Sequence, residues 1–239
     1  MVSFGHPALT VRTGMRGKLL GKTVAFDADS SAGTERTPDG RVALVPQRSN
    51  GRERVALILE AASEVIHERG YEAATMKEFA ERSGTKVGSL YRFFPTKELV
   101  ADALIQFYAK SSEAQWKAII GKAPAATTEQ LADLLLNAYV QARKKHKALQ
   151  ALLESHNEGS KRREEFRARN LERIAQALQA HAPNLKRSDA KTIAVVMLYN
   201  MRTMMALTFD PAAPRVPGVI NELRTSTRSY LVHRLRPKV

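Results

Sequence analysis

The sequence predicts an all-α protein with a small N-terminal helical domain followed by a larger C-terminal one. From residue 51 onward apolar residues recur at intervals of three and four, which is the period of a helix buried on one face. Glycines and prolines separate these periodic segments, and none of the segments alternates convincingly as a strand would. With 44% hydrophobic and 26% charged residues, the chain has the composition of a globular protein that buries a core.

Residues 1–50 precede the periodic pattern. Glycines and prolines recur there without a sustained period, and only Arg41–Val45 alternates as a short strand would. We therefore expect a flexible leader, an N-terminal domain over residues 51–97 and a C-terminal domain over residues 98–239.

The N-terminal domain is predicted to hold three helices. The first ends at Gly70, and the stretch from Thr75 to Glu78 has the sequence of a capping box that opens a short second helix. Gly84 then forces a tight turn. A third short helix ends before Pro95, because proline disfavours helical backbone in the residue that precedes it.

The C-terminal domain carries amphipathic helical patterns throughout. A longer helix follows Thr96, and five more lie beyond Pro124, which gives about nine helices in the whole chain. The longest unbroken apolar run, Ile193–Tyr199, is far shorter than the ~20 residues that a membrane span requires, so no membrane partner is expected.

The first functional signal is a helix, a four-residue turn and a second helix. The turn is Ser83–Lys86, with glycine at the bend, which is typical of the helix-turn-helix unit whose second helix enters the major groove of DNA. Between Arg82 and Lys97 the chain carries four basic residues and no acidic one. The net charge of +14 lies mostly elsewhere, since residues 51–110 are neutral overall and residues 111–239 carry +11. The local pattern therefore indicates DNA binding better than the total charge does.

This segment resembles the DNA-binding domain of TetR-family transcriptional regulators. The resemblance covers about residues 50–100, and a helical remainder of suitable size follows. It is carried by Thr75-Met76-Lys77-Glu78-Phe79-Ala80, Ser83-Gly84, Gly88-Ser89-Leu90-Tyr91-Arg92-Phe93-Phe94 and Lys97-Glu98-Leu99.

The resemblance implies a role for each matched position. Thr75 would bind a phosphate at a helix start, and Tyr91 and Lys97 match the phosphate-contacting residues of the family. Gly88 would let the helix approach DNA closely, and Arg92 could pair with guanine, which is worth ~1–3 kcal/mol of discrimination. The predicted DNA-contacting residues are Thr75, Arg82, Thr85, Lys86, Val87, Gly88, Ser89, Tyr91, Arg92 and Lys97.

Three positions depart from the family pattern. Thr85 replaces the usual aliphatic residue, and Lys86 replaces the usual capping serine. We expect Thr85 to take over as the cap, which would leave Lys86 free for a phosphate or a guanine. Phe93 replaces a frequent histidine, so the operator sequence cannot be carried over from the family.

The resemblance also implies that the C-terminal helices form an effector pocket and a dimer interface. Aromatic or polar residues within apolar helices are candidate pocket residues: Phe107, Trp116, Tyr139, His146, His156, Asn157, Phe166 and Met201. Stripes on the last two helices are candidate dimer contacts: Ile193, Met197, Asn200, Met204, Ile220, Leu223 and Tyr230. Either stripe could instead cover the core of its own protomer.

Other chemistries find no support in the sequence. The chain has no cysteine, which excludes disulfides and thiolate metal sites and fits a reducing cytoplasm. The six histidines show no metal-ligand spacing, Gly21-Lys22-Thr23 lacks the upstream glycine of a phosphate-binding loop, and no Gly-x-Ser-x-Gly elbow occurs. We expect no cofactor, no metal and no enzymatic activity.

The sequence thus predicts a cytoplasmic, homodimeric transcriptional regulator. We expect a repressor that binds a near-palindromic double-stranded operator and is released by a small-molecule effector. The alternative is a non-specific basic protein that coats DNA through the +11 of its C-terminal half.

Overall fold

The computed structural model describes residues 49–154, 161–210 and 212–236. Within these ranges all regular structure is helical, with ten α-helices and one short 3₁₀ turn. The all-α prediction is confirmed. The leader, including its predicted strand at Arg41–Val45, lies outside the described residues apart from Ser49 and Asn50, which already belong to the first helix.

Three helices make the N-terminal unit: α1 (Ser49–Arg69), α2 (Met76–Arg82) and α3 (Val87–Phe93). Gly70 closes α1 with a φ of 80°, and Gly84 makes the bend between α2 and α3 with a φ of 63°, both in the left-handed region that favours glycine. The capping box is present. The Thr75 hydroxyl accepts from the Glu78 amide at 3.3 Å, and the Glu78 carboxylate accepts from the Thr75 amide at 2.9 Å.

The start of α3 differs from the sequence prediction. Lys86, not Thr85, is the N-cap residue, and it makes no side-chain capping bond. The Thr85 amide instead donates to the Ala80 carbonyl at 2.9 Å, which holds the turn against the end of α2. Helix α3 is therefore fixed by its buried side chains and the turn rather than by a cap.

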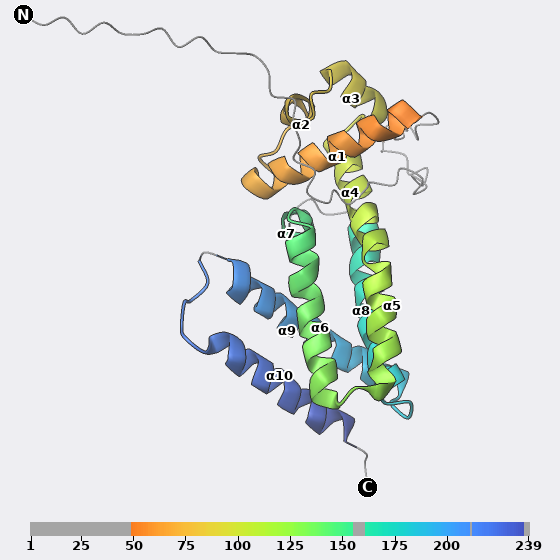
Figure 1. Cartoon of the computed structure of the whole chain (residues 1–239), viewed down its shortest axis with the longest axis vertical. Helices are drawn as coiled ribbons and strands as arrows, with labels where there is room; N and C mark the ends of the chain where they lie inside the picture. Colours follow the sequence, from red (N-terminus) through yellow and green to blue (C-terminus); the bar gives the residue numbers. More distant parts are fainter. Residues whose placement is uncertain (1–48, 155–160, 211, 237–239) are drawn as a thin grey trace, which may run out of the picture.

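The remaining helices are α4 (Lys97–Ser111), α5 (Glu113–Lys122), α6 (Thr128–Lys145), α7 (Leu149–Glu154), α8 (Lys161–His181), α9 (Arg187–Phe209) and α10 (Val219–Leu235). Among the described residues this is one helix more than predicted, because the helix that follows Thr96 breaks at Ser112. The Ser112 hydroxyl donates to the Ala109 carbonyl at 2.8 Å, a local bond that competes with a continuous helix. Figure 1 shows α1–α3 at one end of the molecule and α9 and α10 toward the other.

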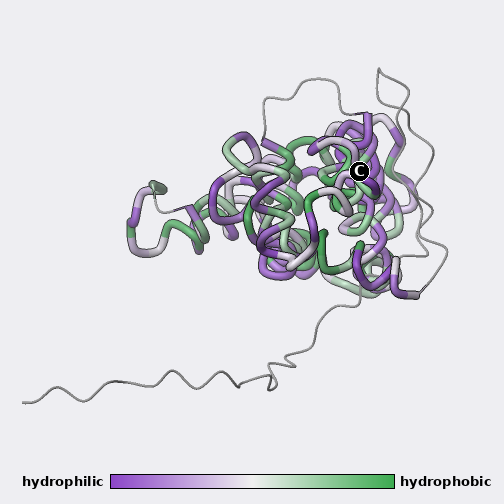
Figure 2. Tube along the Cα trace, turned by 90° about the horizontal axis from the view of Figure 1, so that it is seen from above, coloured by the Kyte–Doolittle hydropathy of each residue, from purple (hydrophilic) through white to green (hydrophobic). Residues whose placement is uncertain are grey.

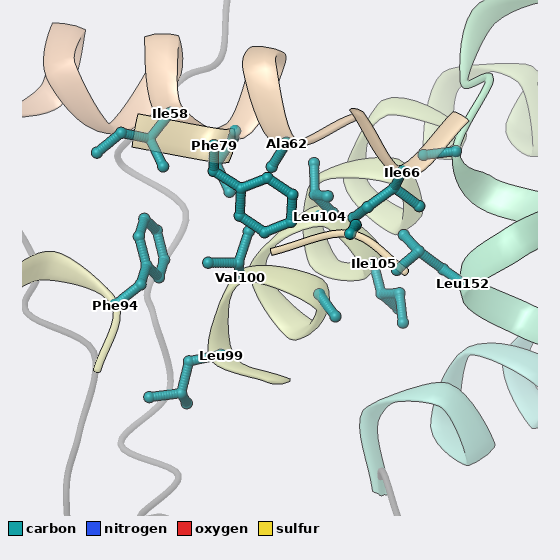
Figure 3. Packing of buried hydrophobic residues seen from close by; sticks show 14 of the residues in the cluster. Ile58, Ala62, Ile66, Phe79, Phe94, Leu99, Val100, Leu104, Ile105 and Leu152 are labelled. Carbon is teal, nitrogen blue, oxygen red and sulfur yellow. The ribbon is translucent and has the colours of Figure 1, made fainter. Parts of the chain in front are cut away.

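The apolar faces of the helices form two clusters, and the alternation of hydrophilic and hydrophobic stretches along the helices is visible in Figure 2. The first cluster joins α1–α4 to Leu152 and Leu153 of α7 and to Phe166 of α8. Figure 3 shows Leu152 near Ile66 and Ile105 in this cluster. Helix α4 thus packs with the N-terminal helices, although it lies beyond the predicted domain boundary at residues 97 and 98.

The second cluster lies between α5, α6, α8, α9 and α10. Helix α9 alone among the described helices is long and apolar enough to cross a membrane by length and composition. One apolar face of α9, which includes Ile193, Met197 and Met201, is buried against α6, α8 and α10. Asp133 of α6 accepts from Arg228 of α10 at 2.7 Å, which ties the last helix to this cluster.

Candidate DNA-binding surface and effector pocket

Helix α3 presents a basic and partly apolar surface to solvent. Leu90 and Phe94 are buried, whereas Lys86 and Arg92 are exposed. Phe93 is half-buried and packs against the first cluster. The exposed face of α3 therefore offers basic side chains of the kind that donate hydrogen bonds to base edges in the major groove of DNA.

Two large apolar side chains lie on the same exposed face of α3. Val87 is 42% exposed and Tyr91, one turn later, is 47% exposed. Gly88 between them is exposed, and a methyl group added to it would meet nothing within 4 Å. The fold of this chain therefore does not require glycine at this position.

Arg82 is held by carboxylates of α1. Its guanidinium donates to both oxygens of Glu68, at 2.7 and 3.0 Å, and to Glu64 at 3.1 Å. These bonds raise the pKa of Arg82 above its ordinary value, so the group stays charged but compensated. Without DNA, the charge of Arg82 therefore stabilises the packing of α2 on α1, and its DNA contact stays a prediction.

Lys97 is also engaged within the protein. Its ammonium donates to the carbonyls of Tyr71, Glu72 and Ala74 at 2.9, 3.0 and 3.1 Å, and it lies 4.5 Å from the centre of the Tyr71 ring. An ammonium has three donors, and all three are used. Without DNA, Lys97 thus joins α4 to the loop that follows α1, and its phosphate contact stays a prediction.

Thr75 is exposed at the start of α2, but its donors are occupied. Its amide and its hydroxyl both donate to the Glu78 carboxylate at 2.9 Å. Those bonds lower the pKa of Glu78, so the carboxylate stays ionised beside the position where a phosphate was expected. A phosphate contact by the Thr75 hydroxyl would require Glu78 to release it.

The structure adds one basic residue that sequence reasoning missed. Arg54 of α1 donates to the Ser89 hydroxyl of α3 at 3.5 Å. The two residues are 35 positions apart, so no local pattern could have joined them. Arg54 thus brings a basic group from α1 to α3, the helix that carries Arg92.

A pocket lies where α4, α5, α6, α7, α8 and α9 meet. Four of the predicted pocket residues line it: Trp116, Tyr139, His146 and Phe166. Phe107 packs beside the pocket, with its ring 5.9 Å from that of His146, and Met201 is buried in the second cluster. His156 and Asn157 lie outside the described residues.

His146 links the pocket to α4. Its Nε2 lies 2.7 Å from the Ser111 hydroxyl, and its ring is 4.4 Å from that of Tyr108, which also lines the pocket. Burial, with a smaller contribution from Lys145, lowers the pKa of His146 to about 4. The imidazole is therefore neutral near pH 7.

Three predicted dimer contacts are corrected. Ile193, Met197 and Met204 are buried in the core of their own protomer and are closed to a partner. The opposite face of α9 is exposed and apolar, with Tyr199 60% exposed beside Val195 and Val196. Helix α9 thus has two apolar faces. The stripe that the sequence periodicity suggested for the dimer contact is the buried one.

The other predicted dimer residues are shared between α9 and α10. The Asn200 amide donates to the Thr227 hydroxyl at 3.2 Å across these helices. Ile220, Leu223 and Tyr230 are half-buried against the second cluster. Within the described ranges no three His, Asp or Glu residues lie close enough together to hold a metal ion.

Comparison with known proteins agrees with this arrangement of a helix-turn-helix domain on a larger helical domain. The profile of bacterial regulatory proteins of the tetR family matches residues 58–104, which contain α2, the turn and α3. The profile of a tetracyclin repressor-like C-terminal domain matches residues 124–231. The chain belongs to the TetR family of bacterial regulatory proteins.

The chain is similar to a curated repressor and to several solved structures. The HTH-type transcriptional repressor KstR from Mycobacterium tuberculosis is 30% identical over 109 residues, which are 41% of this chain and 50% of KstR. The chain thus matches only half the length of this relative. A TetR-family regulator from Streptomyces coelicolor has a TM-score of 0.55 and 24% identity over 76% of this chain and 99% of that one. AibR, solved with isovaleryl coenzyme A and operator DNA, has a TM-score of 0.54 and 20% identity over 77% and 100% of the two chains.

Proposed function

We propose that this chain is a sequence-specific DNA-binding repressor that a small-molecule effector releases from its operator. The observation that carries the proposal is the exposed face of α3. Two exposed basic residues, which have no carboxylate partner among the described residues, and two exposed apolar side chains lie there on the second helix of a helix-turn-helix unit. Arg92 and Lys86 supply donors for guanine or phosphate, and Val87 supplies apolar contact for a thymine methyl group.

The repressor acts as a homodimer in the cytoplasm, with the outer faces of α9 and α10 forming the interface. The exposed apolar group of Val195, Val196 and Tyr199 supplies buried area on α9. Exposed small residues of α10, including Ser226 and Ser229, allow close approach of a second copy. A twofold dimer presents two α3 helices and therefore reads a near-palindromic site.

Effector binding weakens DNA binding by acting on α4. The pocket is lined by Tyr108 of α4, while the same helix packs through Leu99, Val100 and Leu104 on the DNA-binding helices. A ligand that prefers a shifted position of α4 also prefers a shifted position of α3. The coupling is reciprocal, so operator DNA must weaken effector binding by the same factor.

Selection from a pool of random duplexes tests the proposal, with the full chain as bait. We expect enrichment of one near-palindromic sequence, and Arg92→Ala should lose that enrichment while Lys117→Ala, an exposed lysine on α5, keeps it. Retention of duplexes without a common sequence would identify a non-specific coating protein instead.

The dimer is tested by sedimentation of the free protein. Tyr199→Glu places a charge in the proposed interface and should give a monomer, whereas Lys117→Glu, on the exposed side of α5, should leave the dimer intact. A Tyr199→Glu protein that stays dimeric would place the interface elsewhere.

A further inference from the structure

The lining of the pocket is mostly apolar. Apolar side chains from four different helices line it: Trp116, Leu153, Phe166 and Met205. Tyr139 contributes a ring whose hydroxyl pKa is raised by burial, so it stays protonated as a donor. A pocket of this kind favours a ligand with a large apolar part.

Two arginines line the same pocket. Arg143 projects from α6 and Arg202 from α9. Among the described residues neither has a carboxylate within ion-pair distance. Arg143 donates to the Lys147 carbonyl and lies 5.9 Å from the Phe209 ring, whereas Arg202 lies 5.8 Å from the Tyr199 ring.

One hydrogen-bond donor of Arg143 is buried without an acceptor among the described residues. Its Nε is buried and has no partner within the described structure. A buried donor without an acceptor costs free energy, which an incoming acceptor recovers on binding. Burial also lowers the pKa of Arg143 from its ordinary value, which means that the surroundings do not fully solvate its charge.

The remaining polar groups leave the pocket cationic. Glu154 lines it as well, but accepts from Gln150 at 3.1 Å. His146 is neutral because burial lowers its pKa to about 4. Two guanidinium groups against one carboxylate leave a surplus of positive charge beside the apolar lining, and only an anion compensates it.

We propose that the effector is an apolar molecule with an anionic head group, whose carboxylate or phosphate binds Arg143 and Arg202 while its apolar part lies against Trp116 and Phe166. This inference rests on the proposed function of the pocket as the effector site. It excludes cationic drugs and neutral apolar compounds as the main ligand class.

Trp116 makes the inference directly measurable. It is the single tryptophan of the chain, and it lines the pocket, so its fluorescence reports occupancy without DNA. The full chain is titrated with decanoate, with decanoyl coenzyme A and with methyl decanoate. The first two probes separate a carboxylate from the phosphates of a thioester, and the ester keeps the apolar chain without the charge.

We expect a saturable change of Trp116 fluorescence with at least one anionic probe, and binding of the ester weaker by at least about tenfold. Arg143→Met and Arg202→Met should each lose most of that preference, while Arg215→Met, an exposed loop residue, should keep it. Arg202→Met serves alone if Arg143→Met fails to fold. Ester binding equal to the acid, an unchanged preference in both variants, or no saturable response to either anion would overturn the inference. None of these results would affect the selection of an operator, which tests the proposed function separately.

Discussion

The hydroxyl groups of Ser63 and Tyr108 lie 2.9 Å apart and share a hydrogen bond. Ser63 belongs to α1 of the DNA-binding unit, whereas Tyr108 belongs to α4 and lines the pocket. Burial raises the pKa of Tyr108 to about 12, so its hydroxyl keeps its proton across the physiological range. One side chain thus contacts both the effector site and the scaffold that carries α3.

Tyr108→Phe should therefore weaken the effector response. The ring still fills its place against His146, but the hydrogen bond to α1 is lost, at a cost on the order of 1 kcal/mol in stability. We expect operator affinity without effector to change little and the loss of affinity on adding effector to shrink several-fold. Operator binding with and without effector measures this. Tyr230→Phe, a half-buried tyrosine of α10, is the matched control, and an equal response in all three proteins would contradict the coupling.

His146 makes stability depend on pH. Its pKa is lowered from 6.5 to about 4 in the folded protein, so the unfolded chain takes up the proton first as the pH falls. The contribution of the neutral imidazole is complete above pH 6.5 and is lost between pH 6.5 and about 4, on the order of 2 kcal/mol. Urea unfolding at about pH 7 and about pH 5 should show a smaller loss in His146→Gln than in the native protein. A variant of the exposed His233 should behave as the native protein does; the account fails if His146→Gln keeps the native pH dependence.

Gly88→Ala separates folding from DNA binding. The added methyl group meets nothing within 4 Å, so helix α3 should gain about 0.5–1 kcal/mol of stability. The same methyl group should weaken operator binding, because it stands between α3 and the groove floor. Gly121→Ala in α5 is equally unobstructed and should gain stability without losing affinity. Thermal melting measures the stability of both variants, and titration with operator DNA measures their affinity. Undiminished DNA binding by Gly88→Ala would contradict the proposed close approach of Gly88 to DNA.

Lys97→Met should destabilise the protein rather than alter its salt dependence. Three carbonyls lose their donor, which costs about 1–3 kcal/mol. The slope of operator affinity against salt should stay as in the native protein, because no phosphate contact is lost. Lys77→Met, an exposed lysine of α2, is the control for the loss of charge. A slope reduced by about one unit in Lys97→Met would restore the phosphate contact that the sequence predicted.

The helix-turn-helix unit could be predicted from the sequence because its signals are local. The box at Thr75, the bend at Gly84 and the inward Leu90 each depend on neighbours within a few positions. The charges of this unit could not be assigned in the same way. Arg82 is paired with Glu68 and Glu64, which lie 14 and 18 positions away on another helix.

The C-terminal half shows the same limit. The search for aromatic or polar residues within apolar helices identified four residues that line the pocket, among them Trp116 and His146. It succeeded because the wall of a pocket has a composition similar to that of a core. No local pattern marks Arg143 and Arg202 as pocket residues, because only the packing of α6 against α9 brings both to one pocket. On α9 the hydrophobic period identified an apolar stripe through Met197. It did not show that this stripe is buried and that the exposed apolar face runs through Tyr199.

The most direct test of the central claim is fluorescence-anisotropy binding of the full chain to labelled duplexes tiled from upstream of its own gene, against scrambled duplexes, at two salt concentrations. The account predicts one tile bound at least ~10³-fold more tightly than scrambled DNA, with that preference lost in Arg92→Ala. Equal, steeply salt-dependent binding of every duplex would contradict it and would assign the DNA affinity to the +11 charge of residues 111–239.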